Sequence, residues 1–526
     1  MMHRNPSVMK HTFSQVPQAE IPRASFDRSH GHKTTFDAGY LIPIFLDEAL
    51  PGDTFKVRMT GFARLATPIF PVMDNMFMDS FFFAVPYRLV WDNWQKFNGE
   101  QENPGDSTDY LIPQITAPAG GYQVGTLSDY YGIPTGVAGL KHSALWHRAY
   151  NLVWNQWFRD QNLQDSLSVP KGDGPDDPAL YTLQKRGKRH DYFTSCLPWP
   201  QKGPGVTIPL GTMAPVVAQA GTDGVPLFNV PGGGVSPLVG QGGSANVLLN
   251  GNASATGSLT WNESKLEADL SQATAATINS LRQAFQIQKI YERDARGGTR
   301  YTELIKAHFG VTSPDARLQR PEYLGGGTTM VNIHPVAQTS PTGTYAATPQ
   351  GNVSAFGTAL MNGHGFSMSF TEHCLIIGMV CVRADLTYQQ GLNRMFSRRT
   401  RFDFYWPALA HIGEQAVLQK EIFASGTAAD DLVFGYQERF AEYRYKPSII
   451  TGQFRSSAAQ SLDAWHLSQD FGNAPVLDAA FIEENPPLDR VVAVPTEPNF
   501  IMDTYFKMRC ARPMPVYGVP GLIDHF

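Results

Sequence analysis

The sequence predicts an all-β protein, built as a Greek-key or jelly-roll sandwich that carries large, partly helical insertions. Segments with strand periodicity lie far apart in the 526-residue chain, so strands distant in sequence must pair. Such pairing is typical of a Greek key or jelly roll and argues against a hairpin meander. The 38 prolines recur almost everywhere and confine regular helices to a few windows. Length alone would suggest about three domains, but β sandwiches with long insertions often absorb this much sequence.

The N-terminal segment predicts an extended basic arm over residues 1–35, ahead of a jelly-roll domain over residues 36–526. It lacks hydrophobic periodicity, and its first 33 residues hold five cations against two carboxylates. Such an arm can be strapped across its own domain or a neighbouring copy. Alternatively, Arg4 and Lys10 can lie near a polyanion, where basic side chains displace counterions from phosphates.

Four regions carry strand patterns. Residues 55–60 alternate apolar and polar side chains, as a half-buried antiparallel strand should. Residues 76–85 form a continuous apolar and aromatic run, which fits a strand buried on both faces. Residues 366–371 alternate and lead into a second apolar run at 375–382, and residues 506–511 alternate again near the C-terminus.

Two windows predict helices. In residues 143–163, Trp146, Tyr150, Trp154 and Trp157 recur at spacings of four, four and three, on one face. This stripe could stack sugars or bases, but core or interface packing is the commoner use of such a pattern, so Trp146 and Trp154 are candidate assembly contacts.

The second predicted helix covers residues 263–295 and ends at the glycine pair that begins with Gly297. Its apolar stripe includes Leu266, Leu270 and Leu281, which are further candidates for an assembly interface.

The stretch 203–260 contains Asp223 as its only charged residue. A loop this long without secondary structure of its own is unusual and is normally functional or disordered. Its valines and leucines need cover, which copies of the same loop could supply by meeting at a symmetry axis. We therefore expect one insertion over residues 200–300, built from this loop and the helix that follows, in a subunit of an assembly.

The sequence predicts no catalysis, metal or cofactor. Phosphate-binding, metalloprotease and nucleophile-elbow motifs are missing. The acidic pairs at 176–177 and 483–484 lie among prolines and are expected to be solvated, and His373 beside Cys374 is weak evidence for a metal. The four cysteines are too scattered for a disulfide framework, which predicts buried thiols and a reducing compartment. We expect neither a secretory signal nor a membrane span.

Two basic clusters interleave with aromatic residues. The first spans residues 394–406 and includes Arg398, Arg399 and Arg401; the second spans residues 439–455. Single-stranded nucleic acid is held by such mixtures, because bases stack on rings while cations follow the backbone. Arginines and aromatic residues are also enriched at protein interfaces, so both interpretations stay open.

Several long sequence words resemble the major capsid proteins of the Microviridae, in the gokushovirus-like branch of small single-stranded DNA bacteriophages. They span essentially the whole chain and include residues 36–43 (FDAGYLIP), 51–55 (PGDTF), 148–151 (RAYN), 158–162 (FRDQN), 292–301 (ERDARGGTRY), 314–323 (PDARLQRPEY), 401–407 (RFDFYWP) and 485–490 (NPPLDR).

The resemblance implies an eight-stranded antiparallel jelly roll of the viral capsid type and no enzyme activity. It implies a 60-copy T=1 icosahedral shell around a circular single-stranded DNA genome, with the 203–260 loop forming three-fold protrusions used in host attachment. The implied partners are the genomic DNA, a small basic DNA-packaging protein, pilot and internal scaffolding proteins during assembly, and a receptor on the host bacterial surface. The expected location is the virion, assembled in the host bacterial cytoplasm.

The net charge of the chain makes the expected contact with DNA more specific. The formal net charge of −5 means that the subunit cannot neutralise a packaged genome in bulk. Basic residues should therefore gather on the inner face, and a separate cationic partner should do most of the neutralisation. Arg4 and Lys10, together with Arg398, Arg399 and Arg401, are the candidate inner-face contacts.

Two other functions remain open on the residues alone. One is a β-rich carbohydrate-binding protein or glycoside hydrolase that uses the Trp146 and Trp154 face with acidic loops. The other is a non-viral single-stranded DNA-binding protein.

Overall fold

The chain forms two compact units: Met1–Pro200 with Ala295–Phe526, and Gln201–Asp294. The computed structural model describes residues 22–203, 278–339 and 350–517. It also describes short segments in the second unit, namely 205–206, 216–218, 227–229, 235–240, 247–249, 260–261 and 266–268.

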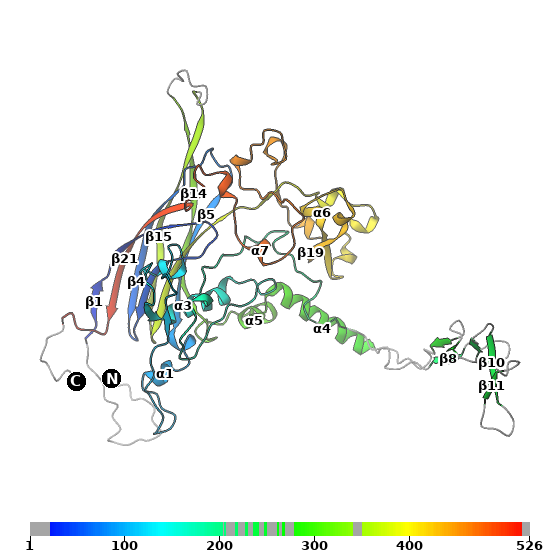
Figure 1. Cartoon of the computed structure of the whole chain (residues 1–526), viewed down its shortest axis with the longest axis horizontal. Helices are drawn as coiled ribbons and strands as arrows, with labels where there is room; N and C mark the ends of the chain where they lie inside the picture. Colours follow the sequence, from blue (N-terminus) through cyan, green and yellow to red (C-terminus); the bar gives the residue numbers. More distant parts are fainter. Residues whose placement is uncertain are drawn as a thin grey trace. The chain divides into compact units, whose positions relative to one another are not determined.

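The first unit is built on one curled antiparallel sheet (Figure 1). Its strands are β1 (Ala24–Asp27), β2 (His30–Phe36), β3 (Ile42–Ala49), β4 (Thr54–Leu65), β5 (Met76–Pro86), β14 (Glu322–Ala337), β15 (Val353–Ser369), β16 (Cys374–Ala384) and β21 (Phe500–Arg512). They lie in the order β1-β21-β4-β15-β14-β5-β16-β3, and β2 also pairs with β21.

The topology confirms the predicted jelly roll. β1 and β2 keep one register along β21 and are bridged by a backbone hydrogen bond from Arg28 to Met508, so they act as a single interrupted strand. The eight resulting strands pair first with last, second with seventh, third with sixth and fourth with fifth. Pairing between strands distant in sequence is the expected consequence of the widely spaced strand patterns.

Part of the predicted N-terminal arm belongs to the sheet. Residues 24–36 form β1 and β2, so the chain is strapped across its own domain there. These strands are hard to predict from the sequence, because β2 lies at the sheet edge and its His, Thr and Lys side chains stay largely exposed. Arg4 and Lys10 lie outside the described residues.

The interior of the jelly roll is aromatic. The Phe45 ring of β3, the last strand in the sheet order, lies 5.1 Å from Phe506 of β21, the second strand, and 5.9 Å from Phe82 of β5. Arg28 forms an ion pair with Asp47 of β3 at 2.7 Å. Side-chain packing and ion pairs thus bring the two ends of the curled sheet together.

The insertion between β5 and β14 covers the outer face of β5, β16 and β3. Its helix α3 (Leu145–Val153) continues into a π-helical turn, Trp154–Phe158, and packs in a second core with Phe83 and Ile377. The predicted helix over residues 143–163 is therefore shorter. The chain leaves helical geometry at Arg159, and the Asp160 carboxylate then accepts hydrogen bonds from the next amides.

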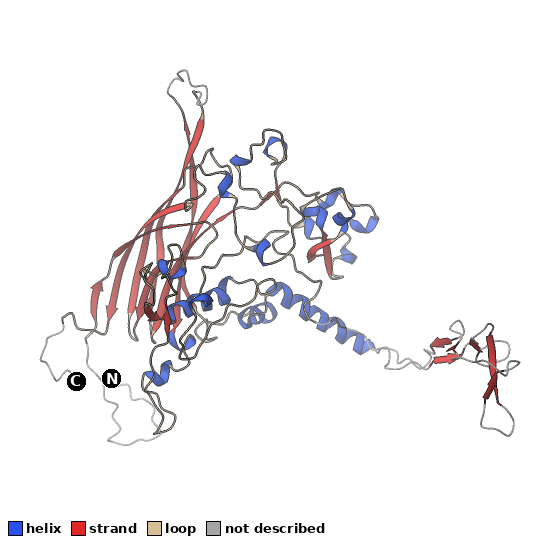
Figure 2. Cartoon of the chain, in the orientation of Figure 1, coloured by secondary structure: helices blue, strands red, loops and turns tan. Residues whose placement is uncertain are grey.

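The remaining elements of this unit are short, and Figure 2 shows its helices lying to one side of the sheet. They are α1 (Trp94–Phe97), α2 (Leu127–Tyr130), α5 (Tyr301–Phe309), α6 (Gln419–Ile422) and α7 (Ala479–Ile482), with β6 (Gln114–Thr116), β7 (Lys141–Ser143), β17 (Thr387–Tyr388), β18 (Glu414–Leu418), β19 (Val433–Glu438) and β20 (Ser448–Ile449). A third core joins β18 and β19 to residues 192–196.

The second unit contains strands where the sequence predicted a loop. β9 (Leu227–Asn229), β10 (Val235–Gly240), β11 (Val247–Leu249) and β12 (Thr260–Trp261) form one small sheet, and β8 (Val216–Ala218) pairs with β13 (Leu266–Ala268). The uncharged stretch therefore has secondary structure of its own.

The predicted helix over residues 263–295 is wrong in its first part. Residues 266–268 form β13, and the helix α4 spans Ile278–Gly297. Periodicity could not reveal β8, the partner strand about fifty residues earlier, whose backbone pairs with Leu266 to Ala268. The predicted end is confirmed: Gly298 follows with φ of +93°, the left-handed conformation that favours glycine after a helix.

Candidate assembly and nucleic-acid surfaces

The two basic–aromatic clusters meet in space. Residues of both line a cavity of about 580 Å³ beside the third core. The Arg398 guanidinium lies 4.4 Å from the centre of the Tyr443 ring and 5.3 Å from that of Phe404. Segments about forty residues apart thus build one surface from cations and rings.

Acidic side chains neutralise part of this surface. Arg394 pairs with Glu421 at 2.9 Å, and Arg398 lies 3.4 Å from Glu442. Burial raises the pKa of the Glu421 carboxyl, and the nearby Arg394 lowers it in part. Arg398 therefore already has an internal partner, which is the geometry of a structural or interface arginine.

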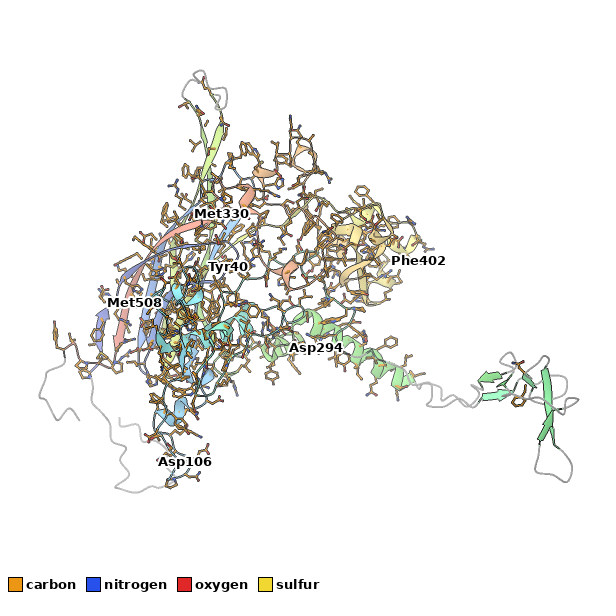
Figure 3. The ribbon with its side chains drawn as sticks, viewed as in Figure 1. Tyr40, Asp106, Asp294, Met330, Phe402 and Met508 are labelled. Atoms are coloured by element: carbon orange, nitrogen blue, oxygen red, sulfur yellow. The ribbon has the colours of Figure 1, made fainter. Side chains whose placement is uncertain are left out.

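Arg399 and Arg401 are more available. Both are exposed, and the Arg401 guanidinium lies 4.6 Å from the centre of the Trp406 ring. The next residue, Phe402, is labelled in Figure 3 and is 61% exposed. Of the three candidate DNA contacts in this cluster, Arg398 is therefore paired, whereas Arg399 and Arg401 are exposed.

The aromatic stripe of α3 is mainly core. Trp154 is 4% exposed and donates its Nε1–H to the Lys185 carbonyl, while Tyr150 donates to the Leu41 carbonyl. Trp157 is half-buried beneath the Arg320 guanidinium. The stripe is not an open stacking platform, and Trp154 offers little surface to a neighbouring subunit. Trp146 is half-buried and remains an assembly candidate.

One member of each acidic pair differs from the prediction of solvated carboxylates, whereas Asp177 is exposed as expected and Glu483 is half-buried. Asp176 is buried and accepts two hydrogen bonds from the Arg148 guanidinium, at 2.7 and 2.6 Å. Glu484 is also buried, and it accepts from the Ala384 amide. Proline-rich surroundings could not indicate partners that lie far away in the sequence. These carboxylates support the structure and do not form an open acid–base pair.

The thiol prediction is confirmed. All four cysteines are free and buried, and burial raises the pKa of Cys374 and Cys381 to about 12. Within the described part of the chain, no cluster of three His, Cys, Asp or Glu side chains could hold a metal ion. No described helix is long and apolar enough to cross a membrane.

The helix α4 exposes apolar side chains. Leu281 is 36% exposed, Phe285 59% and Ile278 70%. Leu266 lies in β13, and Leu270 lies outside the described residues. Of the three leucines predicted to form one stripe, Leu281 is therefore the one placed on a helix with exposed neighbours.

One surface was missed at the sequence level. The polar positions of the alternating strands β4 and β21 carry Lys56, Arg58, Lys507 and Arg509, all exposed. A signal was present, because cations at every second position of a strand must share one face. Their importance depends on the pairing of two strands that are about 450 residues apart.

Comparison with known proteins decides between the remaining functions. Residues 14–522 match the family described as "Capsid protein (F protein)". The chain belongs to this phage capsid-protein family. It is 53% identical to the capsid protein VP1 of Bdellovibrio phage phiMH2K and 45% identical to that of Chlamydia phage 1, with 98% of each chain covered in both comparisons. It is 39% identical to the capsid protein VP1 of Spiroplasma virus 4, over 97% of each chain.

Membership of the F capsid-protein family confirms the gokushovirus-like resemblance. The protein is a structural subunit of a virion shell that assembles with its own copies, and it is not an enzyme. The glycoside hydrolase alternative is therefore set aside, in agreement with the buried state of Trp154 and Asp176.

Proposed function

We propose that sixty copies of this F-family capsid protein form a T=1 icosahedral shell around a circular single-stranded DNA genome. The observation that carries the proposal is the jelly-roll sheet in a chain that matches phage capsid proteins over 98% of its length. Closed symmetry lets modest contacts sum over many copies.

An icosahedral reconstruction of purified particles tests this architecture. We expect sixty equivalent subunits and an encapsidated nucleic acid that is degraded, after particle opening, by a single-strand-specific DNase but not by RNase. A larger number of subunits per shell, or a duplex or RNA content, contradicts the proposal.

The Gln201–Asp294 unit is proposed to form protrusions at the three-fold axes that contact a host surface receptor. Its separation as a compact unit, the nearly uncharged 203–260 stretch and the exposed Leu281 and Phe285 of α4 support this role. Deletion of residues 209–254 should leave the jelly roll folded while it abolishes attachment. Limited proteolysis supplies the control: cleavage in this stretch should be slower in particles than in free subunits, and equal rates oppose a three-fold contact.

Genome packaging is proposed to require a small basic protein, with pilot and internal scaffolding proteins acting during assembly in the host bacterial cytoplasm. The subunit's net charge of −5 supports the need for a cationic partner. Mass spectrometry of DNA-filled particles should detect a second, Lys- and Arg-rich chain. Filled particles that contain this capsid protein alone contradict the requirement.

Arg4, Lys10, Arg398, Arg399 and Arg401 remain proposed inner-face contacts, and the exposed Arg399 and Arg401 are the better supported pair. Phosphate contacts of this kind position DNA without reading its sequence. Arg399→Gln and Arg401→Gln, made singly, should each weaken single-strand binding more than Arg398→Gln does, because Arg398 already contacts Glu442. Equal losses contradict this ranking.

A further inference from the structure

Half of the jelly roll lacks a second layer. The insertions pack on β5, β16 and β3, whereas β21, β4 and β15 alternate buried and exposed side chains along their length. In Figure 1, β1, β21 and β4 lie at the side of the sheet away from α6, α7 and β19. We call the exposed side of β21, β4 and β15 the open face. Insertion residues 124–130 border its end at Phe62 and Ile501, and no described segment forms a layer over the part that carries Lys56, Arg58, Lys507 and Arg509.

Four cations form a square on the open face. Lys507 of β21 lies directly opposite Arg58 of β4, and Arg509 lies directly opposite Lys56. Opposed Cβ atoms in such a pair are about 5 Å apart, and alternate residues along a strand are about 6.8 Å apart. Met508, labelled in Figure 3, lies between the two β21 cations along the chain and points into the core.

This arrangement is unfavourable for the isolated subunit. Like charges directly opposite each other destabilise a sheet. Among the described residues, no ion pair involves Lys56, Arg58, Lys507 or Arg509. The sheet therefore places positive charge where folding alone would favour opposite charges or neutral side chains.

Few carboxylates reach the square. Asp27 of β1 lies opposite Arg509, and hydrogen bonds from Ser29, helped by Arg509 and Lys507, hold the pKa of Asp27 below its usual range. Asp503 of β21 is the carboxylate on the open face itself, and it pairs with Lys33 at 2.9 Å. The open face thus keeps a positive excess in a chain whose net charge is negative.

Exposed rings lie on the same face as the cations. Tyr505 adjoins Lys507 along β21 and is 52% exposed. Phe62 of β4 is 49% exposed; it lies four residues from Arg58, between Asp503 of β21 and Leu360 of β15. Cations that follow a backbone beside rings that accept stacked bases are the combination used by proteins that hold single strands without reading sequence.

We propose that the open face binds the backbone of single-stranded nucleic acid, with phosphates on Lys56, Arg58, Lys507 and Arg509 and bases against Tyr505 and Phe62. The inference rests on the proposed enclosure of single-stranded DNA and deepens it by assigning the contact surface, so this face points to the particle interior. Cations that repeat along two neighbouring strands suit a polymer of regularly spaced phosphates. A single compact anion would instead need donors that converge on one point. Arg394 and Arg398 differ, because Glu421 and Glu442 already pair with their guanidinium groups.

The test compares two fourfold variants of the full-length chain. One replaces Lys56, Arg58, Lys507 and Arg509 with Gln. The matched control replaces four exposed cations outside the open face with Gln: Lys141, Lys171, Lys306 and Arg317. Both lose four positive charges, so a general effect of net charge appears equally in the two. Binding of a fluorescent oligodeoxynucleotide to unassembled subunits is measured against salt concentration, and DNA per particle is measured by absorbance.

For the open-face variant we expect an affinity loss of roughly tenfold or more at 0.15 M salt, and a salt slope shallower by about 3, because each single-strand phosphate contact contributes about 0.7. The control should keep the wild-type slope, and open-face particles should contain less DNA. An unchanged slope in the open-face variant overturns the inference. So does an open-face variant that fails to assemble while its folded subunits bind DNA normally, since the face would then be a contact between proteins. Wild-type particles that hold duplex DNA or RNA would instead contradict the proposed function, whichever residues contact the nucleic acid.

Discussion

The two halves of the jelly roll follow different rules of burial. β16 is almost wholly buried, because the interior lies on one side of it and the α3 layer on the other. β21 and β4 are buried at every second residue and exposed at the others. Both faces of the covered half pack against other parts of the protein. In the open half one face is exposed, so packing does not determine which side chains that face carries.

This difference explains where functional side chains can lie. A strand buried on both faces has no position where a cation can be placed without desolvation, which is unfavourable unless the charge is paired. Arg148 in the covering layer shows the consequence, because it is fully buried and bound to Asp176. On the open face, Lys507 and Arg58 stay solvated, and their charge remains available for a ligand.

The largest expected contrast between the halves is in the cost of losing a ring. Phe83 of β5 is 1% exposed and contacts Trp157 and Phe158, so Phe83→Ala should destabilise the subunit by about 3–5 kcal/mol. Phe62→Ala on the open face should cost less than about 1 kcal/mol, since that ring is half exposed. Urea unfolding of unassembled subunits measures both, and equal losses would show that the open face is not open in the subunit.

The sequence predicted strands in both halves of the sheet, although β3 and β14 were not predicted. The continuous run at 375–382 became β16, and the alternating residues 506–511 became part of β21, because each pattern reflects how many faces are buried. Patterns dominated by polar residues were not recognised: β1 and β2 were assigned to an arm.

The sites were harder to predict than the fold, because their residues meet only through pairing. Arg398 attracted attention as part of a dense local run, yet its partner Glu442 lies forty-four residues further along the chain. The square of Lys56, Arg58, Lys507 and Arg509 has two cations on each of two distant strands. Neither pair stands out by itself, and the register of β4 against β21 is what brings them together.

Acid sensitivity should reside in the layer over the covered half. His147 of α3 is buried beside Tyr131 and Tyr181, and burial, with His142 nearby, lowers its pKa to about 3. The unfolded chain binds this proton near its ordinary pKa of about 6.5. The stabilising effect of neutral, buried His147 is therefore complete above that pH and is lost as pH falls from about 6.5 towards about 3.

Between pH 7 and pH 5, His147 should account for a loss of about 2 kcal/mol in unfolding free energy. His147→Gln, which cannot titrate, should show a correspondingly smaller loss over this interval, even if it is less stable at pH 7. His411→Gln, at an exposed position, is the control and should keep the wild-type dependence. Identical pH dependence in wild type and His147→Gln would place the acid sensitivity elsewhere.

Ring stacking on the open face can be separated from its charge. Tyr505→Ala removes a half-exposed ring and no charge, so it should weaken oligonucleotide binding by about 1–3 kcal/mol while leaving the salt slope unchanged. Val336→Ala, on the exposed side of β14, is a matched change away from the square. A shallower salt slope in Tyr505→Ala would mean that the ring acts by positioning Lys507 or Arg58 rather than by stacking.

The smallest expected effect has the opposite sign. Because Lys507 faces Arg58, the charge-removing change Lys507→Gln should stabilise the unassembled subunit by about 0.2–1 kcal/mol while it weakens DNA binding. The gain should shrink at high salt, because exposed charges are screened there. On the covered half the reverse holds, since Arg148→Gln removes the cation that pairs with the buried Asp176 and should destabilise the fold. Urea unfolding at low and high salt measures the effect, and a loss of stability in Lys507→Gln would show that the lysine serves the fold rather than a ligand.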